Sequence, residues 1–193
     1  DANPATSEGI FVFEGSTSLV NVNIGDRVRL TGTPGENFGT TQLTAAGVQV
    51  CADNQTIPTA SSLTLPVPNV PNGSLAKATA AINSYYEPFE GMLVKFPATL
   101  NVSEYFELER YGQLVLSQGG RVPAFTNISN PGTTGLINHE IKLAKRKIIL
   151  DDGNDKQNFY ITPYAVSNNI PLPYPTGGLS TTNYLRGGDT ISN

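Results

Sequence analysis

A few side chains in this sequence have the types that acid–base chemistry uses, but their spacing gives them few partners. The only histidine, His139, lies in the segment GLINHEIKLAKRK with one acid, Glu140, beside it. A general base needs a second functional group within reach, and adjacent residues on a helix or a strand point in different directions. We therefore interpret His139 as an exposed structural histidine.

An acid-rich segment, LDDGNDKQN, could offer oxygen ligands to calcium from Asp151, Asp152 and Asp155. An EF-hand loop places its acids at alternating positions and ends on a bidentate glutamate, and that spacing is missing here. Aspartate followed by glycine after a strand is typical of a turn. We predict a solvated turn, with no metal site and no cofactor in this chain.

The single cysteine, Cys51, ends an apolar segment that reads as a strand. One cysteine cannot form a disulfide within the chain or a cysteine-based zinc site. No histidine lies near it in the sequence to activate the thiol. We predict that Cys51 is a small buried hydrophobic residue.

The strongest charge feature is the basic segment KLAKRK, which holds Lys142, Lys145, Arg146 and Lys147. Lysine and arginine that neutralise phosphates drive sequence-independent, salt-dependent binding of nucleic acid. These four residues are candidate nucleic-acid ligands, and an ordinary solvated face is the alternative.

A second candidate segment, SEYFELERYG, places aromatic residues beside a cation. Its members are Tyr105, Phe106, Arg110 and Tyr111. Bases that stack on such rings gain about 1–3 kcal/mol each. Three glutamates in the same segment would repel phosphate, so an edge hairpin packed with aromatic residues for core reasons is the alternative.

Composition favours a strand-rich protein with many turns. The 193 residues include 19 Gly and 14 Pro, and only 15% of them are charged. The net charge of −4 is uneven. Residues 1–90 carry eight acids and three bases, whereas residues 91–193 carry eight acids and nine bases. A polyanion should therefore prefer the second half. No run of roughly 18 apolar residues exists, so we expect no membrane span.

The first half of the chain reads as strands separated by turns. GIFVFEG predicts a buried strand, and DRVRLTG, in which apolar and polar residues alternate, predicts a half-buried one. TPGENFGT predicts a turn, and TQLTAAGVQVCA predicts a further strand with a bulge or a bend at Gly47. The proline-rich segment 57–73 predicts an extended surface connection with one strand-like piece.

The second half adds helical signals. Ser74 predicts the cap of a short helix that continues to about Tyr86. Residues 90–117 are the most strand-like part of the chain, with a bend at Gly112. The segment GLINHEIKLAKRKIIL predicts a short helix that is followed by the strand KIIL.

Several separated stretches, in this order, carry a resemblance to a known family: SEGIFVFEG, VNIGDRVRLTGTPGENFGTTQLT, the long stretch from YYEPFEGMLVKF to VPAFTN, RKIILDDG, and TTNYLRGGDT. Together they resemble the OB-fold-like region of large secreted bacterial nucleases. In that family the region precedes a catalytic domain of the endonuclease/exonuclease/phosphatase class. The resemblance covers nearly the whole chain.

The resemblance implies an all-β fold with one or two short helices, arranged as an OB-fold-like Greek-key barrel. The alternatives are two small barrels, or one barrel and a partial second. We divide the chain into a first OB-like segment with its proline-rich connection, residues 1–73, and a helix with a second OB-like segment, residues 74–193. Packing of the two as one domain is the alternative. Family members carry further sequence on both sides, so we expect a piece of a longer protein whose catalytic domain, with its divalent metal, lies elsewhere.

The function implied is that of a non-catalytic module of an extracellular or cell-surface enzyme. It would bind or present DNA or RNA, without sequence specificity, to the catalytic domain of the same polypeptide. A purely structural spacer that docks that domain is one alternative. A carbohydrate-binding module, using exposed tyrosines and polar strands, is another.

Overall fold

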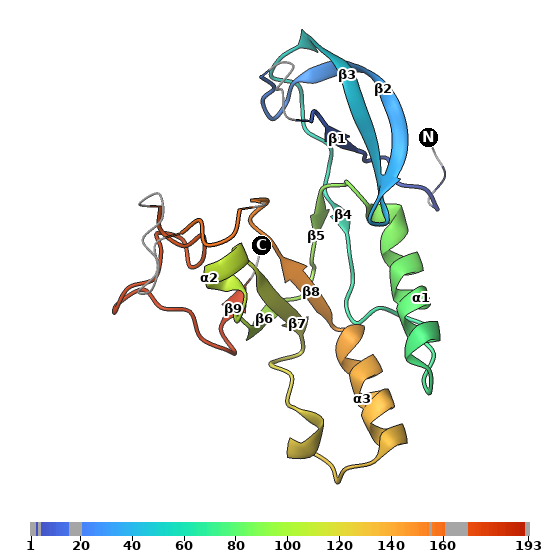
Figure 1. Cartoon of the computed structure of the whole chain (residues 1–193), viewed down its shortest axis with the longest axis vertical. Coiled ribbons are helices and arrows are strands. Elements are labelled where there is room, and N and C mark those ends of the chain that lie inside the picture. Colours follow the sequence, from blue (N-terminus) through green and yellow to red (C-terminus); the bar gives the residue numbers. More distant parts are fainter. Residues whose placement is uncertain (1–2, 4, 16–20, 155, 161–169, 192–193) are drawn as a thin grey trace. The chain divides into compact units, whose positions relative to one another are not determined.

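The computed structural model describes residues 3, 5–15, 21–154, 156–160 and 170–191. This part of the chain is a mixed α/β structure, mostly strands in three open sheets, with three α-helices (Figure 1). The predicted dominance of strands is confirmed, and the helical content is larger than the one or two short helices expected. The Greek-key barrel stays a prediction, because open sheets among the described strands do not test it.

In chain order the elements are β1 (Phe11–Phe13), β2 (Arg27–Asn37), β3 (Thr40–Ala52), β4 (Ser61–Ser62), α1 (Leu75–Tyr86), η1 (Glu87–Phe89), β5 (Val94–Lys95), β6 (Leu100–Glu104), α2 (Leu108–Tyr111), β7 (Leu114–Gln118), η2 (Phe125–Asn127), α3 (Thr133–Ala144), β8 (Lys147–Leu150) and β9 (Thr190–Ile191).

The chain forms two compact units. Unit 1 comprises Asp1–Leu63 and Asn83–Lys95, and unit 2 comprises Thr64–Ile82 and Phe96–Asn193. Residues 83–95 therefore belong with the N-terminal strands, whereas the sequence-based division at residues 73 and 74 grouped them with the C-terminal part.

A long curved hairpin dominates unit 1. β2 and β3 pair antiparallel along their whole length, and the short β1 pairs with β3 in parallel, so the sheet order is β1-β3-β2 (Figure 1). The predicted turn at TPGENFGT is wrong for most of its length, because β2 runs on to Asn37. The chain reverses only at Phe38 and Gly39, which have φ of 52° and 85°. Positive φ at both turn residues matches the twist of a tight hairpin.

The predicted bulge in β3 is confirmed. Thr31 pairs with Gly47, but the next residue, Gly32, pairs with Ala45, so one residue of β3 is left over. A β-carbon at Gly32 would lie 2.3 Å from the carbonyl oxygen of Thr44, so the close approach of the strands requires glycine there. The extra residue increases the bend and twist of the hairpin.

The strands of unit 1 are more exposed than their sequences predict. β1 was expected to be buried, yet Phe11 and Phe13 are 53% and 45% exposed. β2 was expected to be half-buried, yet ten of its eleven residues are exposed. Cys51, expected to be buried, is exposed as well. These three expectations are wrong because the alternation of apolar residues needs a second layer to bury it, and the described sheet is a single layer.

Unit 2 is built on a four-stranded sheet of order β8-β7-β6-β9, in which every pair is antiparallel (Figure 1). The alternate residues Leu114 and Leu116 of β7 and Val102 of β6 are buried, and Ile141 and Leu143 of α3 contribute to the same unit's core. The predicted order of helix and strand in GLINHEIKLAKRKIIL is confirmed as α3 followed by β8. Helix α1 is confirmed too, with the Ser74 hydroxyl accepting a hydrogen bond from the Lys77 amide at 3.4 Å.

The proline-rich segment 57–73 is extended, contains the short strand β4 and exposes most of its residues, as predicted. It also buries one face, because Leu63, Leu65 and Val67 are at most 5% exposed. Their alternation is that of an extended chain with one face buried. The strand-like block is interrupted by α2, where the predicted bend becomes a helix cap: Gly112, with φ of 70°, donates to the carbonyl of Leu108 at 3.0 Å.

Within the described residues, no helix combines the length and the apolar character that crossing a membrane requires.

The junction of α1 and η1 in unit 1 contains a cluster of aromatic rings. The centroids of Tyr85 and Tyr86 lie 5.5 Å apart in an edge-to-face arrangement, and that of Phe89 lies 5.9 Å from Tyr85. Burial, and then the neighbouring Tyr85, raise the pKa of Tyr86 from 10.0 to about 12. The protonated phenol of Tyr86 is thus part of the folded state.

We predict that Tyr86 makes unit 1 sensitive to alkaline pH. The folded state keeps the phenol proton to a higher pH than the unfolded chain, so the contribution is complete below pH 10 and is lost as pH rises through about 12. Between pH 10 and about 12, the free energy of unfolding of Tyr86→Phe should decrease by about 1 kcal/mol less than that of the wild-type protein, allowing for solvent screening. Urea unfolding at several pH values measures this. Tyr105→Phe, at an exposed tyrosine, is the matched control, and equal slopes in both variants would contradict the prediction.

Candidate nucleic-acid interface

The basic segment predicted from the sequence spans the end of α3 and the start of β8. Lys142 is exposed in the last turn of the helix, Lys145 caps it, and Lys147 opens the strand opposite Ser117 of β7. Residues 141–150 contain four bases and no acid. The helix C-terminus itself favours cations, because its last carbonyl groups carry partial negative charge. The lysines of this segment therefore form a local positive surface on unit 2.

Arg146, the fourth member of the segment, is bound to the protein itself. Its guanidinium donates to the carbonyl oxygens of Gln118 and Gly119, each at 2.7 Å, and of Gly120 at 3.3 Å. The turn at Gly119 and Gly120 has φ of 79° and 94°, and the Gly120 carbonyl also accepts the Ser117 hydroxyl at 2.8 Å. Arg146 is thus a positioning residue for the turn after β7, and the exposed cation of the segment is Lys142.

The aromatic candidates lie around α2. Tyr105 is 48% and Phe106 is 80% exposed, so neither is a core residue. The guanidinium of Arg110 lies 4.9 Å from the ring centroid of Tyr111, and its Nε and Nη2 donate to Gln157 at 3.2 and 3.1 Å. Arg110 and Tyr111, which the sequence places side by side, therefore contact each other in the structure.

The structure separates these aromatic residues from the basic segment. Arg110 and Tyr111 precede Leu114 at the start of β7, whereas Lys147 pairs with Ser117 near its end. Each strand residue advances about 3.3 Å, so roughly 10 Å of strand lies between the two positions. Figure 1 shows α2 at one end of the sheet and the junction of α3 and β8 at the other. A single ligand would have to run along the sheet to reach both.

Acidic side chains surround the aromatic residues. A small cavity of about 160 Å³ is lined by Glu104, Phe106, Glu107, Gln113, Val115 and Ile149. One oxygen of Glu107, Oε2, is buried there without a hydrogen-bond partner among the described residues. Carboxylates at this position oppose a phosphate, so the region of α2 suits an aromatic contact better than a phosphate contact.

The acid-rich segment after β8 forms hydrogen-bonded turns. Asp151 and Asp152 accept the amide protons of Gly153 and Asn154 at 2.8 and 2.9 Å. Asp151 also accepts a hydrogen bond from the side chain of Gln113 at 2.6 Å. Burial, and then the carboxylates of Asp152 and Asp151, raise the pKa of Tyr174. Asp155, the third calcium candidate, lies outside the described residues. No group of three or more His, Cys, Asp or Glu side chains in the described ranges is placed to hold a metal ion.

His139 is not exposed, and that part of its interpretation is wrong. It is 7% exposed, its Nε2 lies 3.0 Å from the carbonyl oxygen of Pro123, and its ring centroid lies 5.5 Å from that of Phe125. The sequence missed this because η2, which carries Phe125, folds back against α3 only in the tertiary structure. His139 is a packing residue of unit 2.

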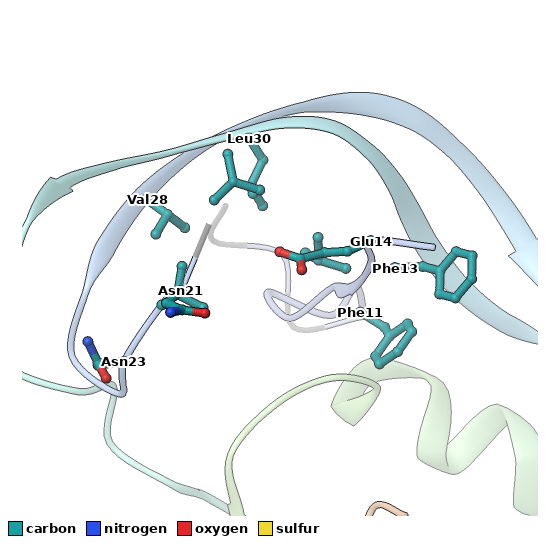
Figure 2. A pocket seen from close by; sticks show the side chains of 10 residues that line it. Phe11, Phe13, Glu14, Asn21, Asn23, Val28 and Leu30 are labelled. Atoms are coloured by element: carbon teal, nitrogen blue, oxygen red, sulfur yellow. The ribbon is translucent and has the colours of Figure 1, made fainter. Parts of the chain in front are cut away.

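Unit 1 contains an open pocket that the sequence did not predict. It encloses about 770 Å³ on the inner side of the curved hairpin and is lined by Phe11, Val12, Phe13, Glu14, Asn21, Val22, Asn23, Val28, Leu30 and Val48. Figure 2 shows Val28 and Leu30 pointing from β2 into this space, with the carboxylate of Glu14 facing it. Its one ionisable side chain is acidic, so the pocket does not suit a polyanion.

Comparisons with known proteins add no relative. A scan against protein-family models, a search of curated proteins and a search of solved structures each found no match. The assignment of a function is therefore a proposal.

The position of Arg146 predicts a structural role that differs from that of its neighbour Lys142. Arg146→Ala removes the guanidinium from the carbonyl groups of Gln118 and Gly119, while Gly120 keeps the Ser117 hydroxyl as a donor, and it should lower the free energy of unfolding by roughly 2–3 kcal/mol. Lys142→Ala, which removes an exposed charge, should change it by less than about 0.5 kcal/mol. Urea unfolding compares the two variants, and hydrogen exchange at the Gly120 amide reports the turn directly. Equal decreases in stability would contradict the role assigned to Arg146.

Proposed function

We propose that this chain is a non-catalytic, OB-fold-like module of an extracellular bacterial nuclease that binds or presents DNA or RNA to a catalytic domain of the same protein. The observation that carries the proposal is the basic segment at the junction of α3 and β8. There, three lysines and one arginine fall within six residues without an intervening acid. A patch of this kind attracts a phosphate backbone without reading its sequence.

Two further features support the proposal. The bulged, strongly curved β2–β3 hairpin of unit 1 is the kind of ribbon from which small barrels are built (Figure 1). The exposed rings of Tyr105 and Phe106, with Arg110 stacked on Tyr111, offer sequence-tolerant contacts to bases. The divalent metal of the nuclease family would act in the catalytic domain, and we assign no catalytic step to this chain.

The spacer function is favoured by a different observation. The net charge is −4, and the guanidinium of Arg146 is used within the protein. A module that only orients its catalytic domain needs no positive surface of its own. The two functions therefore differ in whether the lysines of the basic segment contact a ligand.

Charge reversal of the lysines separates these functions. The variant Lys142→Glu/Lys145→Glu/Lys147→Glu should bind a labelled oligonucleotide at least tenfold more weakly in roughly 50 mM salt, because fewer phosphates are neutralised and fewer counterions are released. The wild-type affinity should itself fall steeply between roughly 50 and 200 mM salt. Fluorescence anisotropy measures both effects.

The matched control is Arg27→Glu/Arg29→Glu/Lys77→Glu, which reverses three exposed cations outside this segment and changes the net charge equally. An equal weakening in both variants would show that only net charge matters. If the wild-type protein does not bind the oligonucleotide at low salt, the nucleic-acid-binding function is wrong and the spacer function is favoured.

A further inference from the structure

Two loops of unit 2 that are distant in sequence are joined by one side chain of β6. The Oδ1 atom of Asn101 accepts the amide proton of Gly120, after β7, at 3.0 Å. Its Nδ2 donates to the carbonyl oxygen of Gly188, before β9, at 3.2 Å. Gly120 and Gly188 have φ of 94° and 103°, conformations that glycine adopts without strain. The turn after β7 and the loop before β9 are therefore held side by side.

Arg121 extends from the first loop across the second. A β-carbon added to Gly187 would lie 3.0 Å from both Nε and Cζ of the Arg121 guanidinium. Glycine at position 187 is thus what leaves room for this side chain. Arg121 remains exposed, although its guanidinium lies against the backbone of the second loop.

The second loop presents a cation stacked on a ring. The guanidinium carbon of Arg186 lies 4.0 Å from the ring centroid of Tyr184, which is 52% exposed. The loop is closed by Asp189, which accepts the Arg186 amide proton at 2.7 Å and donates its own amide to the Arg186 carbonyl at 3.1 Å. The stacked pair is therefore carried on a hydrogen-bonded turn.

The local charge is positive. Residues 118–124 and 180–191 contain two arginines, Arg121 and Arg186, and one acid, Asp189, whose carboxylate is used by the backbone of the loop. Arg146 adds a third guanidinium beneath the turn after β7. We use the name arginine–tyrosine cluster for Arg121, Tyr184 and Arg186.

We propose that the arginine–tyrosine cluster is a binding site for single-stranded nucleic acid, an inference that rests on the proposed function. The Arg121 guanidinium offers a planar fork of donors that fits two oxygens of one phosphate. The Tyr184–Arg186 pair offers a flat, partly exposed surface on which a base can stack. A base in a duplex has no free face to offer, so the pair selects an unpaired strand.

The cluster differs in this respect from the basic segment. The lysines of α3 and β8 supply point charges, which neutralise any phosphate backbone, single- or double-stranded. The cluster adds a ring next to a guanidinium, and the ring is what distinguishes an unpaired base from a paired one. Binding at the basic segment should therefore be similar for a single strand and a duplex, whereas binding at the cluster should favour the single strand.

The test compares variants by fluorescence anisotropy with a labelled single strand and with the duplex of the same sequence. Tyr184→Ala should weaken single-strand binding roughly five- to one-hundred-fold and leave duplex binding unchanged, and Tyr184→Phe should restore it. Arg121→Gln should weaken binding and lower the slope of log K against log salt by about 0.7, because one phosphate is no longer neutralised. Lys156→Gln, at another cation–aromatic pair of unit 2, is the control and should have a small effect.

The outcomes distinguish this inference from the proposed function. If the wild-type protein binds a single strand but the Tyr184 and Arg121 variants match Lys156→Gln, the cluster is not the site, although the module still binds nucleic acid. An equal weakening of duplex and single-strand binding in Tyr184→Ala would overturn the selection of unpaired bases. If the wild-type protein binds neither probe, the proposed function fails and the inference fails with it. Circular dichroism of each variant confirms that the fold is kept.

Discussion

The guanidinium of Arg146 donates to three successive carbonyl groups, those of residues 118–120, and the surface of unit 2 depends on this contact. Because the turn after β7 is held by Arg146 on one side and by Asn101 on the other, Arg121 leaves the turn in a defined direction. The same contact means that the four cations of the basic segment are not equivalent. Arg146 is thus used for a structural purpose, whereas Lys142 and the arginine–tyrosine cluster are exposed.

The two units use their strands differently. In unit 2 the alternation of apolar residues in β6 and β7 produces a core, with Val102 and Leu114 almost fully buried. In unit 1 the same kind of alternation leaves Phe11, Phe13 and Val28 exposed along one curved layer and around an open pocket. The difference follows from the number of layers, because an apolar face is buried only when another element covers it. The chemistry proposed for the chain accordingly lies on unit 2, where the framework is packed.

Local sequence patterns predicted helix ends and bends well at positions where one residue type determines the backbone conformation. Ser74 at the start of α1 and Gly112 at the bend could be identified because a cap and a left-handed residue have few alternatives. The bulge beside Gly47 could be found in the same way. Burial was harder to predict. Cys51 and His139 both differ from expectation, because their exposure depends on segments far away in the sequence that either cover them or do not.

The candidate site shows the same division. The sequence by itself determined that the cations of this acidic chain concentrate in its second half, that KLAKRK lies where a helix passes into a strand, and that a cation neighbours a tyrosine at Arg110 and Tyr111. Only the tertiary structure decided that Arg146 is used internally, that Arg121 lies against Gly187, and that Arg186 stacks on Tyr184. Charge and helix caps are properties of a few adjacent residues. The meeting of two loops depends on the pairing of β6 with both β7 and β9, which no local pattern specifies.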